Sequence, residues 1–177
     1  GVAVLFERIL DQIKSDLRGI SVLALSVVFV VILMNYRGLW HTLLTLVPLV
    51  SGAIAMVAIM NLAGLKFNII NVGMLPLIIG IGVDYGVYVV QRWMDEGKGL
   101  DSIRPVIEST GRAVTLSALT TMIGFASIIL ARWQGLKLMG ANLTMGIGLC
   151  WLAAVVFLPS ILKIIELVRD RQGKKRP

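Results

Sequence analysis

The sequence carries little charge for its length. Of its 177 residues, 15% are charged and 57% are hydrophobic, and the mean hydropathy is +0.88. A soluble domain of this size covers its apolar core with more charged surface than this chain can supply. The composition therefore excludes an ordinary soluble domain and predicts an integral membrane protein.

Cysteine and histidine are almost absent. Cys150 is the only cysteine and His41 the only histidine, which excludes an internal disulfide and any CxxC or zinc-ligand pattern. No nucleophile is paired with a base, so we expect no enzyme, no metal site and no bound cofactor. The glycines of "GIGVDYG" (residues 80–86) lie inside an apolar run with no preceding strand, which excludes a dinucleotide-binding loop.

The net charge of +7 does not point to nucleic acid. Lysine and arginine stand at the ends of apolar runs and in the final stretch "RDRQGKKRP", and no basic face with interleaved aromatics is present. Basic residues at these positions are typical of the cytoplasmic loops of membrane proteins, where they contact anionic lipid. We therefore expect membrane lipids, and no nucleic acid, among the partners.

Five apolar runs are long enough to cross a bilayer, at about 20 residues per crossing. They lie near residues 19–36, 40–63, 68–91, 112–131 and 138–163. The sequence thus predicts an all-α integral membrane fold, a bundle of about five transmembrane helices spanning residues 19–165. Residues 1–18 have helical amphipathic spacing and are expected to form an extracytoplasmic lead-in helix, and residues 166–177 a basic cytoplasmic tail.

Loop charges favour one orientation. If residues 1–18 lie outside the cytoplasm, eleven of the 17 lysines and arginines fall on the inner side and six on the outer side. This bias predicts a multi-pass protein of the cytoplasmic (inner) membrane with a cytoplasmic C-terminus. The stretch between the third and fourth runs is expected to form a short surface helix, capped by Asp101 or Ser102 and ended by Gly111.

Asp84 is the one acidic residue in the middle of an apolar run, in "GIGVDYGVYVV". A carboxylate at membrane depth is costly and usually functional, and none of the five apolar cores supplies a lysine or arginine to pair with it. The group is easily buried when protonated but demands water or a cation when ionised. It is therefore suited to coupling proton passage to a change of shape; the alternative is a carboxyl kept protonated as a structural hydrogen-bond donor.

Small residues surround this position. Successive residues of a helix are about 100° apart, which places Gly80 on the Asp84 side of the third run and the Gly82–Gly86 pair on roughly the opposite side. Such glycines let neighbouring helices approach closely, and we expect the same of Gly124 in the fourth run.

The fourth run also carries a face of small and hydroxyl-bearing residues, including Ser117, Thr120 and Thr121. We expect this face to pack against the Asp84 side of the third run and to supply hydrogen bonds or hold water there. The alternative is that the hydroxyls bond the carbonyls of their own helix and only permit close packing.

The stretches "FNIINVGMLPLIIGIGVDYGVYVVQRW" and "STGRAVTLSALTTMIGFAS" together resemble the membrane domain of the RND (resistance–nodulation–division) superfamily, in its MMPL-type and hydrophobe/amphiphile exporter branch. The similarity covers nearly the whole chain. It implies half of a membrane domain built from two six-helix repeats, each with a large porter domain after its first span. The chain begins with Gly1 and not methionine, and we expect it to be a piece of a longer protein, with the C-terminal repeat favoured.

The resemblance also implies a function. Asp84 and Tyr85 match the proton-relay pair of the family, with Thr120, Thr121 and Ser117 in support. The chain would then be the proton-relay segment of a proton-motive-force-driven exporter of lipids or other hydrophobic or amphiphilic molecules. Protons are the coupling ion, and the expected partners are the other six-helix repeat, the porter domains and further copies in a homo-oligomer. A sterol- or lipid-sensing membrane module and a Sec-type translocation accessory remain as alternatives.

Overall fold

The computed structural model describes residues 2–62 and 69–173, and these residues form helices and short turns with no strand among them. Five helices within the described residues are long and apolar enough to cross a membrane. The predicted all-α membrane fold with about five spans is confirmed, and the segment is a multi-pass one. Residues 63 and 68, where two predicted spans end and begin, and residues 174–177 of the predicted tail lie outside the described residues. The bounds of the lead-in helix, membrane domain and tail stay predictions.

The first three spans are single helices: α1 (Val2–Tyr36), α2 (Leu39–Leu62) and α3 (Ile69–Asp95). The last two spans are composite rods in which an α-helix is interrupted by a π-helical turn. The fourth consists of α4 (Leu100–Pro105), η1 (Val106–Gly111), α5 (Arg112–Ser127) and η2 (Ile128–Leu130), and the fifth of α6 (Gln134–Leu152), η3 (Ala153–Phe157) and α7 (Leu158–Gly173).

The predicted short surface helix before Gly111 is wrong in its end and in its cap. Gly111 keeps helical dihedral angles, and the chain continues through it from η1 into α5. Gly111 is the last residue of the π turn and does not end the helix, so the fourth span extends from Leu100 to Leu130. Gly99 is the N-cap residue of α4, and no side chain caps this end; the Ser102 hydroxyl donates instead to the carbonyl of Gly99, at 2.8 Å.

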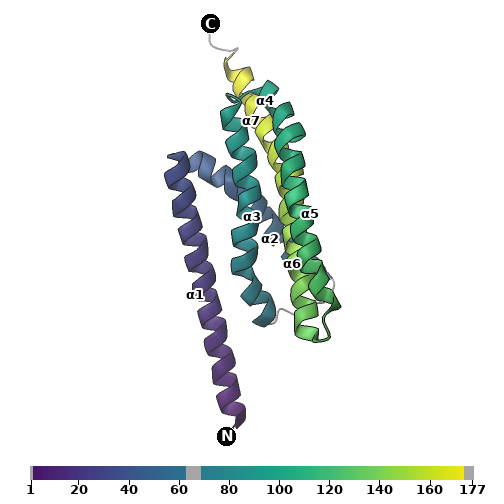
Figure 1. The fold of residues 1–177 in the computed structure, drawn as a ribbon. Helices are drawn as coiled ribbons and strands as arrows, with labels where there is room; N and C mark the ends of the chain where they lie inside the picture. Colours follow the sequence, from purple (N-terminus) through teal and green to yellow (C-terminus); the bar gives the residue numbers. More distant parts are fainter. Residues whose placement is uncertain (1, 63–68, 174–177) are drawn as a thin grey trace.

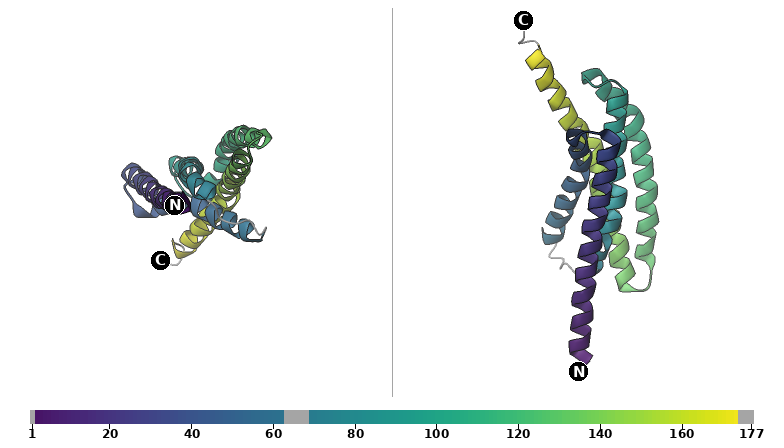
Figure 2. Two further views of the ribbon diagram at one scale, coloured as in Figure 1. Left: turned by 90° about the horizontal axis from the view of Figure 1, so that it is seen from below. Right: turned by 90° about the vertical axis from the view of Figure 1, so that its left-hand side faces the viewer.

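The spans run alternately up and down, so the two ends of the chain lie at opposite ends of the bundle (Figure 1). α3 lies between α1 on one side and α5 and α6 on the other, as both Figure 1 and the left view of Figure 2 show. The N-terminal part of α1 extends beyond the other helices (Figure 2, right). α3 is thus the central helix, in contact with α1, α2 and α6.

The core lies where α2, α3 and α6 meet. Large apolar side chains from all three helices are fully buried there, among them Met60, Met74 and Ile147. α5 joins this core through Val114 and Ala118. By contrast α1 is little buried, and it meets α3 mainly near its C-terminal end. This packing fixes α3 firmly on one side and leaves its other side more open.

Candidate functional site

Asp84 lies on the open side of α3. Its side chain is exposed, and it lines a groove of about 480 Å³ between α3 and α1, whose walls include Val28 and Ile32 of α1. Among the described residues no side chain forms an ion pair or hydrogen bond with the carboxyl group. Two polar side chains from the C-terminal end of α1, Asn35 and Tyr36, line the same groove. An ionisable group therefore stands in a mostly apolar groove with room around it.

Tyr85 points the other way, into the core. Its side chain is only 3% exposed and belongs to the cluster formed with α2, α5 and α6. The buried hydroxyl has no hydrogen-bond partner within the described part of the chain. The Thr121 hydroxyl lies close enough to interact with it but does not reach hydrogen-bonding geometry. The adjacent residues Asp84 and Tyr85 thus face different surroundings, as expected for neighbours about 100° apart on a helix.

The threonine hydroxyls on the predicted polar face of α5 bond their own helix. Thr120 and Thr121 both donate to the carbonyl of Ser117, at 2.8 and 2.9 Å. Ser117, Thr120 and Gly124 are exposed, and a Cβ added to Gly124 would meet nothing within 4 Å. The structure brings Thr121 towards Tyr85, but it leaves the rest of this face exposed and without a partner among the described residues.

The open faces of α3 and α5 approach each other at one point. Tyr88, one turn after Asp84, and Ser117 line the same hollow of about 370 Å³, together with Thr110. Gly80, one turn before Asp84, has open space beside its α-carbon. A polar and small-residue surface therefore extends over both helices, with the Asp84 carboxyl at its α3 side.

Two glycines on the opposite side of α3 lie at close helix contacts. A Cβ on Gly82 would stand 2.9 Å from the sulfur of Cys150 in α6, and one on Gly86 would stand 2.1 Å from the main-chain oxygen of Thr45 in α2. Small residues at these positions let α3 approach both neighbours. They hold the helix that carries Asp84 in place.

One cluster of polar side chains was not predicted from the sequence. The Lys98 ammonium lies 3.0 Å from Nε2 of His41 and 5.7 Å from the ring centre of Trp93. Glu166 of α7 lines a hollow with these three residues; it is 6% exposed, and its Oε1 has no hydrogen-bond partner among the described residues. The position of Glu166 four residues after a buried leucine, on the apolar stripe of the last helix, is the signal that could have found it.

The described residues contain no cluster of three or more His, Cys, Asp and Glu side chains that could hold a metal ion.

Comparison with known proteins decides the family. A sequence model of the MMPL family matches residues 1–175. The chain belongs to the MMPL family. The predicted resemblance to MMPL-type members of the RND superfamily is therefore confirmed.

Relatives of this MMPL segment come from bacteria and archaea. The hopanoid transporter HpnN of Burkholderia multivorans is 32% identical over 139 residues, which are 77% of this chain and 15% of that protein. The probable trehalose monomycolate exporter MmpL3 of Mycobacterium leprae is 29% identical over 171 residues, 92% of this chain and 18% of that protein. The putative membrane protein MJ1562 of Methanocaldococcus jannaschii is 24% identical over 164 residues, 90% of this chain and 42% of that protein. The chain thus spans less than half the length of these relatives. No solved structure matches the MMPL segment.

Proposed function

We propose that this chain is the proton-relay membrane segment of an exporter that moves lipids or other hydrophobic or amphiphilic molecules across the cytoplasmic membrane. The observation that carries the proposal is the Asp84 carboxyl, which is exposed in a membrane-spanning helix and has no partner among the described residues. Relatives named as a hopanoid transporter and a probable trehalose monomycolate exporter support a lipid-like cargo. Membership of a transporter family also speaks against a catalytic role, and none is proposed.

Protons are the proposed coupling ion, without any further cofactor. Asp84 is neutral when protonated and needs water when ionised, so its groove favours different packing in the two states. The Tyr85 hydroxyl, buried without a hydrogen-bond partner, is available to bond a water molecule that enters the core. Thr121 lies beside it, and Thr120 and Ser117 line the open face where such water would pass. A membrane potential contributes about 2.3 kcal/mol per charge for each 100 mV, which is the driving force for this step.

The exposed polar and small residues of α3 and α5 are expected to be covered by another part of the full-length protein. An ionisable group facing lipid is costly, and the Asp84 groove and the exposed Ser117, Thr120 and Gly124 are polar or small enough to pack against protein or water. We propose the other six-helix repeat of the full-length protein as the element that closes this surface. The porter domains and further copies of the protein in a homo-oligomer are the remaining proposed partners.

The proposed orientation places the C-terminus in the cytoplasm of the cell. The end of the bundle that carries the C-terminal part of α7 also carries the α1–α2 and α3–α4 turns (Figure 1). Basic residues are gathered at that end, including Arg37, Lys98 and Arg171. A gathering of this kind supports a cytoplasmic position in the inner membrane.

Replacing Asp84 by asparagine in the full-length protein tests the proposal. Asp84→Asn keeps the size and polarity of the side chain but cannot bind and release a proton. We expect a well-folded variant whose proton flux, measured with a pH-sensitive dye in vesicles under an imposed pH gradient, falls to the level of empty vesicles. Asp95→Asn is the matched control, since Asp95 lies at the end of the same helix and is exposed. Unchanged flux in Asp84→Asn would remove the carboxyl from the mechanism and favour the lipid-sensing alternative, for which the apolar α1–α3 groove would be the binding site.

A further inference from the structure

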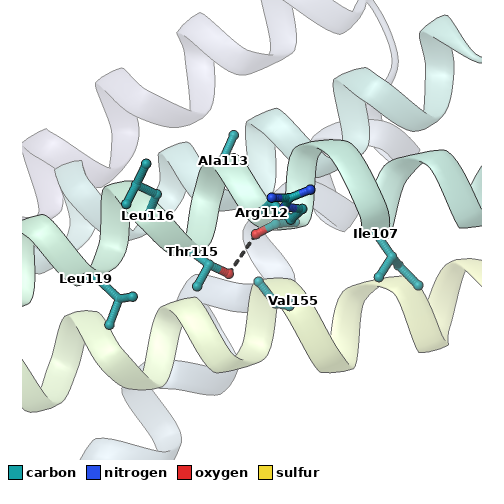
Figure 3. A pocket seen from close by; sticks show the side chains of 8 residues that line it. Ile107, Arg112, Ala113, Thr115, Leu116, Leu119 and Val155 are labelled. Atoms are coloured by element: carbon teal, nitrogen blue, oxygen red, sulfur yellow. Dashed lines mark hydrogen bonds between the residues drawn. The ribbon is translucent and has the colours of Figure 1, made fainter.

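Two adjoining hollows run along the side of the bundle formed by the fourth and fifth spans. Their volumes are about 600 and 680 Å³, and both are lined by Ile107 of η1 and Val155 of η3. Figure 3 shows the first hollow, with Ile107, Thr115 and Leu119 on one helix and Val155 on its neighbour. Together they form one groove, here called the π groove, that extends from α5 towards α7.

The π groove lies where both rods depart from α-helical geometry. The π turns Val106–Gly111 and Ala153–Phe157 both line it, and turns of this kind occur frequently at functional sites. Pro105 immediately precedes η1, and Pro159 follows η3 by two residues; proline cannot donate the usual helical hydrogen bond. A proline thus lies close to each of the two π turns that line the groove.

The floor of the groove is held rigidly. The Thr115 hydroxyl donates to the carbonyl of Gly111, at 2.7 Å (Figure 3), and accepts a hydrogen bond from the Trp151 indole of α6, at 3.0 Å. The bond from Trp151 ties α6 to α5 at a residue that lines the groove, and the bond to Gly111 holds the Thr115 side chain in place for it. The hollow is therefore a fixed feature of the fold.

The groove combines charged and apolar side chains. Its second hollow is lined by Arg104, Glu108 and Lys163, and its first by Arg112. Arg104 is paired with Glu108 at 2.8 Å, whereas neither Arg112 nor Lys163 forms an ion pair with any described residue. Two exposed cations are thus left to attract an anion.

Most of the remaining lining is apolar, and part of it faces outwards. Leu116 is 66% exposed and Val156 54% exposed, and both lie in spans long and apolar enough to cross a membrane. We expect a surface of this kind to contact lipid chains. The occupant that matches an apolar wall with two unpaired cations, one in each adjoining hollow, is an amphiphile with an anionic headgroup.

We propose that the π groove binds one anionic phospholipid, with its phosphate held by Arg112 and Lys163 and an acyl chain lying along Leu116 and Leu119. This site is separate from Asp84 and does not depend on the proposed proton relay. It places a specific lipid against the two π turns of the fourth and fifth spans.

Lipid binding by the purified full-length protein tests the site. Palmitoyl-oleoyl phosphatidylglycerol and palmitoyl-oleoyl phosphatidylcholine are each titrated onto delipidated protein, and the bound lipid is counted by native mass spectrometry. We expect Arg112→Gln/Lys163→Gln to lower the affinity for phosphatidylglycerol about tenfold or more and to leave that for phosphatidylcholine unchanged, since each basic residue contributes to the attraction of anionic lipid. The matched control is Arg132→Gln/Lys137→Gln, which removes two exposed charges at the other end of the same spans and should bind like the wild type.

A third variant separates a seated lipid from a diffuse positive surface. Val155→Trp fills the groove without changing its charge and should also weaken phosphatidylglycerol binding several-fold. The proposal is overturned if the Arg112/Lys163 variant keeps its preference for phosphatidylglycerol, if the control pair loses as much, or if Val155→Trp binds normally. Displacement of the lipid by inorganic phosphate would equally overturn it, since the site would then be one for a free anion.

Discussion

The α-carbon of Gly86 lies directly against the main-chain carbonyl of Thr45. A Cβ at residue 86 would stand 2.1 Å from the Thr45 oxygen and 3.0 Å from its carbonyl carbon, closer than any side chain can be accommodated. Thr45 is itself fully buried, with its hydroxyl bonded to the carbonyl of His41 at 2.9 Å. The contact therefore sets the distance between α2 and α3, half a turn after Asp84.

Replacing Gly86 by alanine should force these helices apart. The obstructing atom belongs to the backbone of α2, so the clash cannot be relieved by a change of side-chain rotamer. We expect Gly86→Ala to lower the free energy of unfolding by about 1–3 kcal/mol, measured by denaturation of the full-length protein in mixed micelles. Gly19→Ala is the control, because a Cβ there meets nothing within 4 Å. Equal stability of Gly86→Ala and wild type would show that the helices do not approach as closely as described.

A second prediction concerns the bond between α5 and α6. Thr115→Val keeps the shape of the side chain but removes the acceptor of the Trp151 indole N–H. The unfolding free energy should fall by about 0.5–1.5 kcal/mol, and Thr115→Ser should retain most of it. Thr144→Val serves as the control, since the Thr144 hydroxyl bonds only the carbonyl of Gly140 in its own helix. A loss of the same size in both valine variants would mean that the interhelical bond contributes nothing.

The sequence is sufficient to predict an integral membrane protein, its five spans and the presence of one acidic residue, Asp84, in the middle of a span. Each depends on composition or on the spacing within one helix, which are local properties. Helical spacing also separates Gly82 and Gly86 from the Asp84 side, and these two glycines lie at close contacts whereas Gly80 does not.

Contacts between helices could not be predicted in the same way. A helical wheel shows that Ser117, Thr120 and Gly124 share a face, but it does not show which neighbour that face meets. The helix end predicted at Gly111 was wrong because a π turn, which no local sequence pattern indicates, continues the helix through the glycine. The hydrogen bond from Tyr36 to Val87 joins residues 51 positions apart, and no local sequence pattern predicts it.

That bond gives a third prediction. The Tyr36 hydroxyl donates to the carbonyl of Val87, at 3.1 Å, and α1 has few other buried contacts. Tyr36→Phe should therefore loosen α1 from α3 and raise amide hydrogen exchange in the C-terminal half of α1, with little change in α6. Tyr88→Phe is the control, because Tyr88 is 57% exposed and its hydroxyl has no hydrogen bond among the described residues. If exchange rises equally in both variants or in neither, the Tyr36 hydroxyl does not anchor α1.

The last prediction asks whether the open face of α5 lines water in the full-length protein. Ser117 and Gly124 lie on one side of α5, where Ser117 lines a hollow with Tyr88 of α3, whereas Leu116 and Ile123 are exposed apolar side chains about 100° away around the same helix. Water-soluble methanethiosulfonate reagents react with a thiolate, which forms only where water reaches the sulfur. Cysteines at residues 117 and 124 should therefore react at least about tenfold faster than cysteines at 116 and 123, which we expect to face lipid.

The native Cys150 does not interfere with this measurement. It is fully buried between Gly52 and Gly82, where an added Cβ would stand 2.7 and 2.9 Å from its sulfur, so it should not react until the protein unfolds. Each cysteine on the open face is one residue from its apolar counterpart, a difference in depth of about 1.5 Å, so the side of the helix decides the rate. Slow reaction at all four sites would mean that protein seals the open face without water, and Asp84 would then need another route for its proton. Fast reaction at 116 and 123 alone would reverse the assignment of the lipid-facing side and with it the place of the π groove in the membrane.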